Sequence, residues 1–217
     1  MRTACTCVVW SPLWLTLCLS VLLTMFPSPL TAQSIVDEWP SVKAPPAPEL
    51  KPVTVDPKVT ALLMLDFNKQ TCNAERRPRC VSSIPRVEKL LKFARQKGLL
   101  IAHTLSAGAV PADIAKELAP VEGEPVVASG PDKFLGTDLE KILKEKGIKT
   151  VIAVGTAAHG AVLYTASGAA LRGMQVIVAV DGISAEGLFA EQSALWILAN
   201  APRISANVTL TKIDLIR

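Results

Sequence analysis

Short apolar segments alternate with amphipathic helical segments from Thr60 to the end of the chain, and this alternation limits the fold more than any other feature. Each apolar segment is four to six residues long, the length of a β-strand, and has no charged residue. Strands that are apolar throughout and are joined by helices form a parallel sheet covered on both faces. We therefore predict a three-layer α/β/α sandwich with a mainly parallel sheet, whose strands are Thr60–Leu65, Leu99–Ala102, Pro125–Ala128, Thr150–Val154, Gln175–Val180 and Asn207–Leu210.

The helices of this alternation are indicated by their apolar faces and by the residues at their ends. In Ile84–Lys97 apolar side chains recur every three or four residues, and Gly98 follows at the position where glycine commonly ends a helix. A second helix starts at a capping box, Thr137–Glu140, and ends before Gly147. The other predicted helices are Pro111–Leu118, Ala158–Leu171 and Ala185–Asn200.

The first 32 residues have a composition that is typical of a secretory signal. Arg2 is the only charged residue before Asp37, a long apolar run follows it, and Ala32 supplies the small residue expected at a cleavage point. An uncleaved membrane anchor is the alternative, because the run approaches the ~18–20 residues that span a bilayer. We predict a signal peptide over residues 1–32, an exported protein that is periplasmic or secreted, and no membrane segment after cleavage.

Residues 33–58 contain six prolines. Proline lacks the amide hydrogen and fixes φ, so this stretch can form neither a helix nor a central strand. We predict a proline-rich tether over residues 33–58 and one domain over residues 59–217. The net charge of +4 is small and evenly spread, so we predict no nucleic-acid partner.

Cys72 and Cys80 are the two cysteines that remain after the expected cleavage. A lone close pair in an oxidising compartment usually forms a disulfide, although a catalytic or metal-binding thiol is the alternative. We predict a structural disulfide that closes the loop Asn73–Arg79, whose arginines we expect to stay out of the core. The two histidines, His103 and His159, lack the spacing of metal ligands, so we predict neither a metal site nor another cofactor.

Ligands of open parallel sheets bind beyond the carboxyl ends of the strands, where this chain has Asp66, His103, Ser129, the segment Gly155–Ala161 and Asp181. Asp66 follows five apolar residues, and burial there would raise the pKa of its carboxyl and suit it to proton transfer. A helix cap or a loop hydrogen bond is the alternative role. The small residues of Gly155–Ala161 either let a ligand reach backbone N–H groups at a helix N-terminus or serve tight packing.

Two stretches of the sequence resemble the isochorismatase-like hydrolase superfamily. They are LLMLDFN, which contains Asp66, and FLGTDLEKILKEKGIKTVIAVGTAAHGAVLYTASGAALRGMQVIVAVDGIS, which spans Phe134–Ser184. The resemblance extends over Thr60 to Leu215 and implies the same three-layer fold and a small-molecule substrate. Members often form dimers or larger assemblies, so it also makes a homo-oligomer one expectation.

The superfamily's catalytic set is an aspartate after the first strand, a lysine after the third and a cysteine that opens the helix after the fourth. Asp66 matches the aspartate, whereas Ala161 stands at the cysteine position and closes the thioester route. The lysine position, counted back from Phe134, falls on Ala128. Lys133 lies five residues later, and it either reaches Asp66 or is a solvated surface lysine.

Isochorismatases proper also lack the cysteine, and they hydrolyse a vinyl ether with the aspartate as the acid. The segment Ala158–Ala161 is similar to their motif, which places this chain in the non-cysteine branch. The resemblance further implies a cis peptide between Thr156 and Ala157. It implies a substrate-binding set of Asn68, Thr156, Ala157, His159 and Gly160.

The leading expectation is an exported hydrolase in which Asp66 acts as general acid on a small polar molecule. Backbone N–H groups of Thr156–Ala161 would stabilise developing negative charge. Two alternatives stay open: a catalytically inactive small-molecule-binding protein, because two catalytic positions are altered, and an envelope interaction partner with a proline-rich arm. Isochorismate chemistry is usually cytoplasmic, so export argues against isochorismate itself.

Overall fold

The computed structural model describes residues 34–217, which divide into two units, described separately here. In the first unit, which ends at Ala44, helix α2 (Ile35–Glu38) continues into the 3-10 turn η1 (Trp39–Ser41). The backbone N–H and the hydroxyl of Ser34 both donate to the Asp37 carboxylate, which fixes the start of α2. The predicted signal peptide, residues 1–32, lies outside the described residues.

The second unit, Pro45–Arg217, contains a six-stranded sheet in which every pairing is parallel. The strand order is β3-β2-β1-β4-β5-β6, so the chain starts at the centre and extends first to one edge and then to the other. The strands are β1 (Thr60–Leu65), β2 (Leu100–Ser106), β3 (Val126–Ser129), β4 (Thr150–Thr156), β5 (Gln175–Ser184) and β6 (Val208–Thr211).

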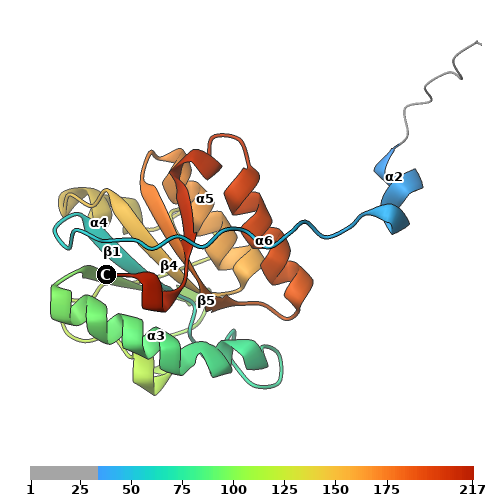
Figure 1. Cartoon of the computed structure of the whole chain (residues 1–217). Helices are drawn as coiled ribbons and strands as arrows, with labels where there is room; N and C mark the ends of the chain where they lie inside the picture. Colours follow the sequence, from blue (N-terminus) through green and yellow to red (C-terminus); the bar gives the residue numbers. More distant parts are fainter. Residues whose placement is uncertain (1–33) are drawn as a thin grey trace, which may run out of the picture. The chain divides into compact units, whose positions relative to one another are not determined.

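Helices cover both faces of this sheet (Figure 1). Helix α3 (Pro78–Lys97) packs on one face, and α4 (Leu139–Glu145), α5 (Leu163–Leu171) and α6 (Leu188–Asn200) pack on the other. The side chains of β1 alternate between two separate apolar cores: Leu62 and Met64 face the core of α3, and Leu63 and Leu65 face the other core. The predicted three-layer sandwich with a parallel sheet is therefore confirmed.

Shorter helical turns connect these elements. They are η2 (Pro111–Asp113), η3 (Lys116–Leu118), the π turn η4 (Ala158–Val162), η5 (Ser205–Asn207) and η6 (Ile213–Leu215). The single helix predicted over Pro111–Leu118 is therefore two separate 3-10 turns. The residues between them, Ile114 and Ala115, are extended, and their segment pairs with Asn68 and Phe67 after β1.

Three strands are longer than the apolar runs that predicted them, and one of them, β4, continues to Thr156. Strand β2 continues through His103 and Thr104, and β5 continues through Asp181, because the polar residues find partners within the fold. The side chain of His103 hydrogen bonds with Glu124 at 2.8 Å, and Asp181 accepts a bond from the N–H of Ile213 at 2.9 Å. Polar residues inside a buried strand are tolerated when their hydrogen bonds are made.

Several helix starts also differ from the prediction, since α5 begins at Leu163 rather than Ala158 and α6 at Leu188 rather than Ala185. Helix α3 begins at Pro78 rather than Ile84, since proline at the first helical position needs no amide partner. The capping box expected at Thr137–Glu140 does not close, because the Glu140 carboxylate pairs with Lys144 and Arg172 instead of turning back to the helix start.

The second half of the predicted tether belongs to the domain. From Pro45 the chain is extended and packs on the domain, and Val53 exchanges backbone hydrogen bonds with Leu215 and Arg217. The boundary thus lies after Ala44, and not at residue 58 as predicted. The prediction that residues 33–58 form no helix was wrong for Ile35–Glu38, which precede the first proline of this stretch and form α2. The prolines from Pro45 onward exclude a helix, but the residues between them keep their N–H groups and use them for pairing.

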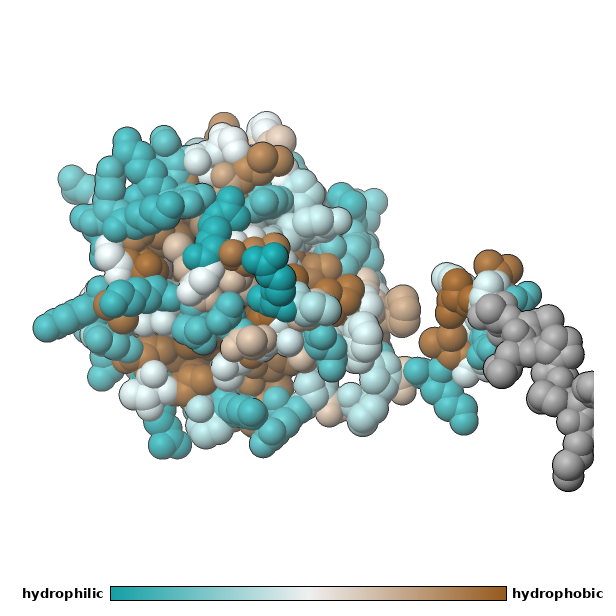
Figure 2. Space-filling model, turned by 90° about the horizontal axis from the view of Figure 1, so that it is seen from above, coloured by the Kyte–Doolittle hydropathy of each residue, from teal (hydrophilic) through white to brown (hydrophobic). Residues whose placement is uncertain are grey.

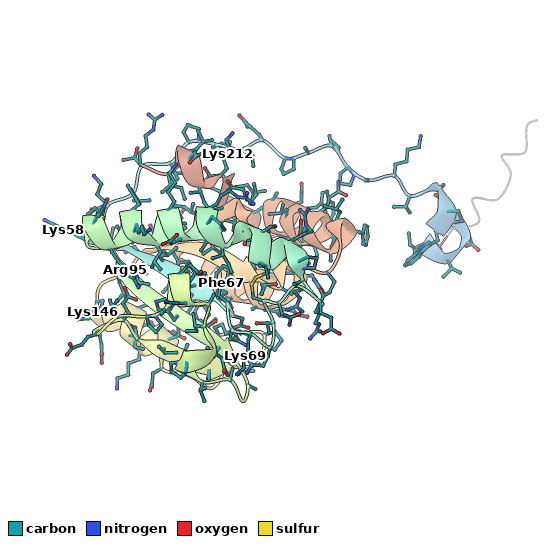
Figure 3. All side chains as sticks on the ribbon, turned by 90° about the horizontal axis from the view of Figure 1, so that it is seen from below. Lys58, Phe67, Lys69, Arg95, Lys146 and Lys212 are labelled. Atoms are coloured by element: carbon teal, nitrogen blue, oxygen red, sulfur yellow. A yellow bond between two sulfur atoms is a disulfide. The ribbon has the colours of Figure 1, made fainter. Side chains whose placement is uncertain are left out.

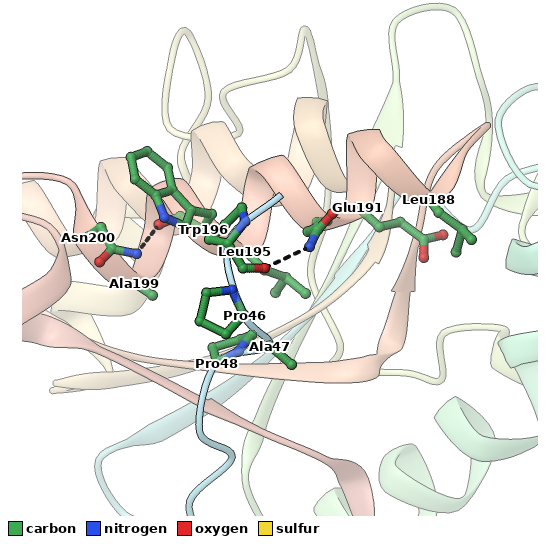
Figure 4. A pocket seen from close by; sticks show the side chains of 11 residues that line it. Pro46, Ala47, Pro48, Leu188, Glu191, Leu195, Trp196, Ala199 and Asn200 are labelled. Carbon is green, nitrogen blue, oxygen red and sulfur yellow. Dashed lines mark hydrogen bonds between the residues drawn. The ribbon is translucent and has the colours of Figure 1, made fainter. Parts of the chain in front are cut away.

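A groove of about 590 Å³ lies between this extended segment and the outer side of α6. Its walls are Pro45–Pro48 and α6 residues that include Trp196, and Gln192 spans it with a hydrogen bond to the carbonyl of Pro45 at 3.3 Å (Figure 4). None of the strand-end residues singled out by the sequence lines this groove. The groove is therefore separate from the sheet-end site described below.

The surface mixes polar and apolar side chains on the face shown in Figure 2, where hydrophilic residues interrupt the apolar patches. Within residues 34–217, no helix combines the length and the apolar character required to cross a membrane.

Gly155 permits the close contact between β4 and β1 on which the centre of the sheet depends. Its φ is +136°, and a Cβ there would lie 2.0 Å from the carbonyl oxygen of Leu65. We expect Gly155→Ala to lower the free energy of unfolding by about 3 kcal/mol or more, from backbone strain and overpacking. Urea unfolding measures this. Gly187→Ala is the control, because a Cβ there meets nothing within 4 Å and its φ is −148°; equal stability losses would refute the prediction.

Candidate active site

The site lies where the strand order reverses, between β1 and β4. Leu65, the last residue of β1, is in register with Thr104 on one side and Gly155 on the other. Asp66 follows directly and is only 5% exposed, with its backbone in the left-handed region at φ +54°. Such a reversal leaves a crevice at the carboxyl ends of the strands, so Asp66 stands where this fold binds ligands.

A buried ion pair joins Asp66 to Lys133. The Lys133 Nζ lies 2.8 Å from the Asp66 Oδ2, and the lysine side chain is completely buried. The same Nζ donates to the carbonyl oxygens of Leu105 at 3.1 Å and Ser129 at 3.2 Å. These three acceptors match the three donor positions of an ammonium group, so the Lys133 side chain is held in one place.

The turn after β3 places Lys133 at this position. The N–H of Lys133 donates to the Thr165 hydroxyl at 3.3 Å, and its carbonyl accepts the Thr137 hydroxyl. Counting back from Phe134 assigned the family's lysine position to Ala128. The structure places Ala128 as an exposed residue of the edge strand β3. The lysine that pairs with Asp66 is therefore Lys133, and the alternative of a solvated Lys133 was wrong, because its side chain is completely buried with its Nζ 2.8 Å from the Asp66 carboxylate.

Thr104 holds the other oxygen of the Asp66 carboxylate. Its Oγ1 donates to Asp66 Oδ1 at 2.6 Å, and it accepts the Asp66 backbone N–H at 3.2 Å. Sequence-based prediction missed this residue because it placed Thr104 beyond the end of its strand. The available signal was position, because Thr104 lies within two residues of the end of the second apolar run, as Asp66 lies at the end of the first.

The pKa of Asp66 is raised above its ordinary value. Burial is the largest cause, since it penalises the charged carboxylate, whereas the charge and hydrogen bond of Lys133 and the Thr104 hydroxyl act in the opposite direction. The charge of Arg77 also lowers this pKa. The site thus combines a carboxyl group that protonates more easily than usual with two fixed donors.

Asn68, predicted to bind substrate, is fully buried and engaged within the protein. Its Nδ2 donates to Gln70 at 2.7 Å and to the Ser106 hydroxyl at 3.0 Å, and its Oδ1 accepts the N–H of Ser106 at 3.2 Å. A substrate contact would require this network to open. In the structure Asn68 instead fixes the chain after β1 to the end of β2.

The loop from β1 to α3 is tied down by a disulfide and an arginine. Cys72 and Cys80 form the predicted disulfide, with their Cα atoms 5.4 Å apart. Arg77 donates to the carbonyl of Thr71 at 3.1 Å and to the Glu186 carboxylate at 2.6 Å. Arg77 is only 6% exposed, so the expectation that the arginines of this loop avoid the interior was wrong for Arg77, because Glu186 compensates its charge.

Lys69 and Phe67, which precede this loop, and Arg95 of α3 can be followed in Figure 3. Phe67 is 2% exposed and packs in the core beneath α3, whereas the Lys69 ammonium reaches the Asp113 carboxylate at 2.7 Å. Phe67 therefore anchors the chain directly after Asp66 in the core, and Lys69 ties the following residues to η2.

The bend from β4 into α5 follows Gly155, the residue in register with Leu65. Thr156 and Ala157 are joined by a cis peptide, as the resemblance implied. The Thr156 hydroxyl donates to the carbonyl of Ser184 at 3.1 Å, so its side chain serves the sheet, and only its backbone is left for a ligand. Gly160 has non-helical angles within η4, and Ala161, at the nucleophile position, is 4% exposed.

His159 is the exposed member of this bend. It lies close enough to Glu186 to help lower the pKa of that carboxyl, after the larger effect of the hydrogen bond from Arg77. His159, Arg77 and Glu186 therefore form a polar rim beside Asp66 that combines segments from η4, the start of α3 and the β5–α6 connection.

The structure does not bring His103 or Asp181 to the site. The imidazole of His103 is buried against Glu124, and burial lowers its pKa. Asp181 caps the start of η6, as described above. Ser129 contributes through its carbonyl, which accepts Lys133. Across residues 34–217, no three His, Cys, Asp or Glu side chains gather in a way that could hold a metal ion.

A family model described as the isochorismatase domain matches residues 60–211. That range contains all six strands and both members of the Asp66–Lys133 pair, and the chain belongs to the isochorismatase family. The chain is also similar to the secreted isochorismatase effector Isc1 of Verticillium dahliae, with 36% identity over 113 residues. The match covers 47% of this chain and 60% of that relative, so the chain matches less than two thirds of the relative's length.

Solved structures share the fold at low sequence identity. An isochorismatase from Pseudomonas putida KT2440 has a TM-score of 0.66 and 19% identity, covering 76% of this chain and 93% of that chain. N-carbamoylsarcosine amidase from Thermoplasma acidophilum has a TM-score of 0.62 and 21% identity, and the match covers 72% of this chain and 97% of that chain. Since the names of these two proteins denote different reactions, the likeness shows the fold alone.

The buried ion pair predicts a strong coupling between its two members. Lys133→Met leaves a buried carboxylate without its partner, so we expect the free energy of unfolding to fall by about 3–5 kcal/mol at neutral pH. The double variant Asp66→Asn with Lys133→Met removes both charges and should recover most of that loss. Urea unfolding of the single and double variants measures the coupling.

The loss in Lys133→Met should depend on pH in a defined direction. With its partner gone, Asp66 has a folded-state pKa further above the unfolded value, so the penalty is absent in acid and grows as the pH rises through the folded-state pKa. A Lys133→Met variant as stable as wild type at neutral pH, or a double variant less stable than Lys133→Met, would contradict a buried ion pair.

Proposed function

We propose that this protein is an exported isochorismatase-like hydrolase that cleaves vinyl ethers of small carboxylic acids by acid catalysis from Asp66, without a cysteine nucleophile. The observation that carries the proposal is the Asp66 carboxyl at the strand-order reversal, with Lys133 at 2.8 Å from one oxygen and Thr104 at 2.6 Å from the other. Membership of the isochorismatase family supports the hydrolase class.

The two neighbours of Asp66 favour transfer of its proton to a substrate. Lys133 and Thr104 both donate to the carboxyl group, so neither can take the proton of the protonated acid while these hydrogen bonds are kept. That proton occupies a remaining lone pair and is available to a bound molecule. The same two donors then stabilise the carboxylate that forms when the proton leaves.

The reaction needs no covalent intermediate. Asp66 gives its proton to the terminal carbon of the vinyl ether double bond, which leaves an oxocarbenium ion at the carbon that carries the ether oxygen. Water adds to that carbon and returns a proton to Asp66, and the resulting hemiketal breaks into a ketone and an alcohol. Backbone N–H groups of the Thr156–Ala161 bend are suited to a substrate carboxylate.

The position of Ala161 supports the non-cysteine route. Its methyl group cannot act as a nucleophile, and the only cysteines among residues 34–217 are joined in the disulfide. An acyl–enzyme thioester is therefore not part of the proposed mechanism.

Export is supported by the apolar N-terminal segment, by the disulfide and by the name of the Verticillium dahliae relative, a secreted isochorismatase effector. That name joins secretion to the isochorismatase activity in one protein. The argument that export excludes isochorismate is thereby weakened, and we include isochorismate among the proposed vinyl ether substrates.

Turnover should require the protonated form of Asp66. Because the pKa of Asp66 is raised, we expect kcat/KM for isochorismate to be highest at acidic pH and to fall as the pH rises through that pKa. Asp66→Asn keeps the shape of the side chain and tolerates a positive φ, but it carries no acidic proton. We expect it to lose at least about a hundredfold in kcat/KM.

Three results of this experiment bear on the function. Loss of turnover in Asp66→Asn with an unchanged circular dichroism spectrum supports acid catalysis. Full activity of that variant excludes it. Tight binding of isochorismate by wild type without any turnover, measured by calorimetry, would establish the inactive binding protein in place of the enzyme.

The assignment of Ala161 to the nucleophile position can be tested with a thiol. Ala161→Cys should place a sulfur in η4, directly before the start of α5, where the positive end of the helix lowers the pKa of a thiol. We expect iodoacetamide to alkylate that position about tenfold faster at neutral pH than the exposed thiol of Ala206→Cys, as followed by peptide mass spectrometry. A rate below that of the exposed control would show that residue 161 does not face the cleft.

A further inference from the structure

Asp66 is the only residue in the described chain, apart from Arg203, that has a positive φ without being glycine. Aspartate in this region is held there by its surroundings. Thr104 supplies two of the contacts that hold it, one from its hydroxyl to the Asp66 carboxylate and one from the Asp66 N–H to the same hydroxyl oxygen.

These two bonds set the direction of the Thr104 hydroxyl. One lone pair of Oγ1 accepts the Asp66 N–H at 3.2 Å, and its proton points to Oδ1 at 2.6 Å. Thr104 itself is 1% exposed and lies on β2 beside the β1 residue that precedes Asp66. Because Thr104 is buried, its hydroxyl does not turn toward water in competition with the bond to Asp66. Thr104 therefore fixes both the backbone and the carboxyl plane of Asp66.

We propose that Thr104 is a positioning residue for Asp66, holding the carboxyl group in one orientation at the carboxyl end of β1, beside the end of β4. This inference rests on the proposed role of Asp66 as the acid and assigns Thr104 no contact with the substrate. Lys133 restrains only one of the two Asp66 oxygens. With that hydrogen bond alone, the carboxyl group is free to rotate about the bonded oxygen. The second bond, from Thr104, removes that freedom.

Other charged groups near Asp66 do not share this role. The titratable or charged groups on the surrounding elements are Lys133 after β3, Arg77 at the start of α3, Glu186 after β5, His159 in η4, and His103 with Glu124 beside β2. A change at Thr104 that keeps its shape leaves all of them in place. Its effect on Asp66 therefore reports on the hydroxyl alone.

The test compares Thr104→Val, which keeps the shape and removes the hydroxyl, with Thr104→Ser, which keeps the hydroxyl. The full-length protein is labelled with ¹³C-carboxyl aspartate, and the Asp66 signal is identified by its loss in Asp66→Asn. Thr211→Val is the matched control, because Thr211 is equally buried on β6 and its hydroxyl makes only a 3.4 Å contact with the next carbonyl. The Asp66 N–H keeps its bond to the Thr104 carbonyl in every variant, so folding is not at risk from that group.

We expect Asp66 in Thr104→Val to titrate about one pH unit higher than in wild type, because a hydrogen bond to its charged form is lost. Thr104→Ser and Thr211→Val should titrate close to wild type. With isochorismate, Thr104→Val should lower kcat about tenfold with little change in KM, and Thr104→Ser should restore it.

The titration requires no substrate, so it separates this inference from the proposed function. Absence of turnover in wild type would overturn the proposed function and leave the titration as the test of Thr104. An Asp66 signal that titrates identically in wild type and Thr104→Val, or a Thr104→Ser variant that behaves like Thr104→Val, would overturn the positioning role.

Discussion

The pair of Asp66 and Lys133 is the interaction on which the site depends. Two opposite charges lie 2.8 Å apart with almost no solvent access, and removing either one would leave the other buried and uncompensated. The cost of burying them is offset by further hydrogen bonds, since Lys133 also donates to two carbonyls and Asp66 accepts Thr104. The pair therefore fixes the turn after β3 against the end of β1.

The surroundings of this pair suit a buried carboxyl group to the proposed role of general acid. Burial raises the pKa of Asp66 toward the range in which a general acid is useful. The hydrogen bonds from Lys133 and Thr104 act in the opposite direction, because they lower the free energy of the buried carboxylate once the proton has left. The positive φ of Asp66 adds local strain, and the hydrogen bonds of Thr104 and the ion pair of Lys133 maintain it. Preorganisation of this kind is what an acid without a covalent partner needs.

The loop between β1 and α3 extends this rigidity to the rim of the site. The disulfide joins Cys72 to the first turn of α3, and Arg77 connects the same loop to Glu186 beyond β5. A short loop that would otherwise be mobile is thus held at both ends. In an oxidising compartment this covalent bond persists, which agrees with the proposed export.

The sequence by itself determined the layers, the parallel sheet, the disulfide and the place of Asp66 after a buried strand, because apolar periodicity and residue spacing are local properties. It did not determine that Lys133, five residues after the expected position 128, is the lysine buried against Asp66. Nor did it determine that Thr104 binds Asp66 or that Arg77 is buried against Glu186. Those contacts join residues 38 to 109 positions apart, and only strand order and register bring them together. Local patterns cannot specify such pairs, since each depends on how neighbouring strands and turns are placed in three dimensions.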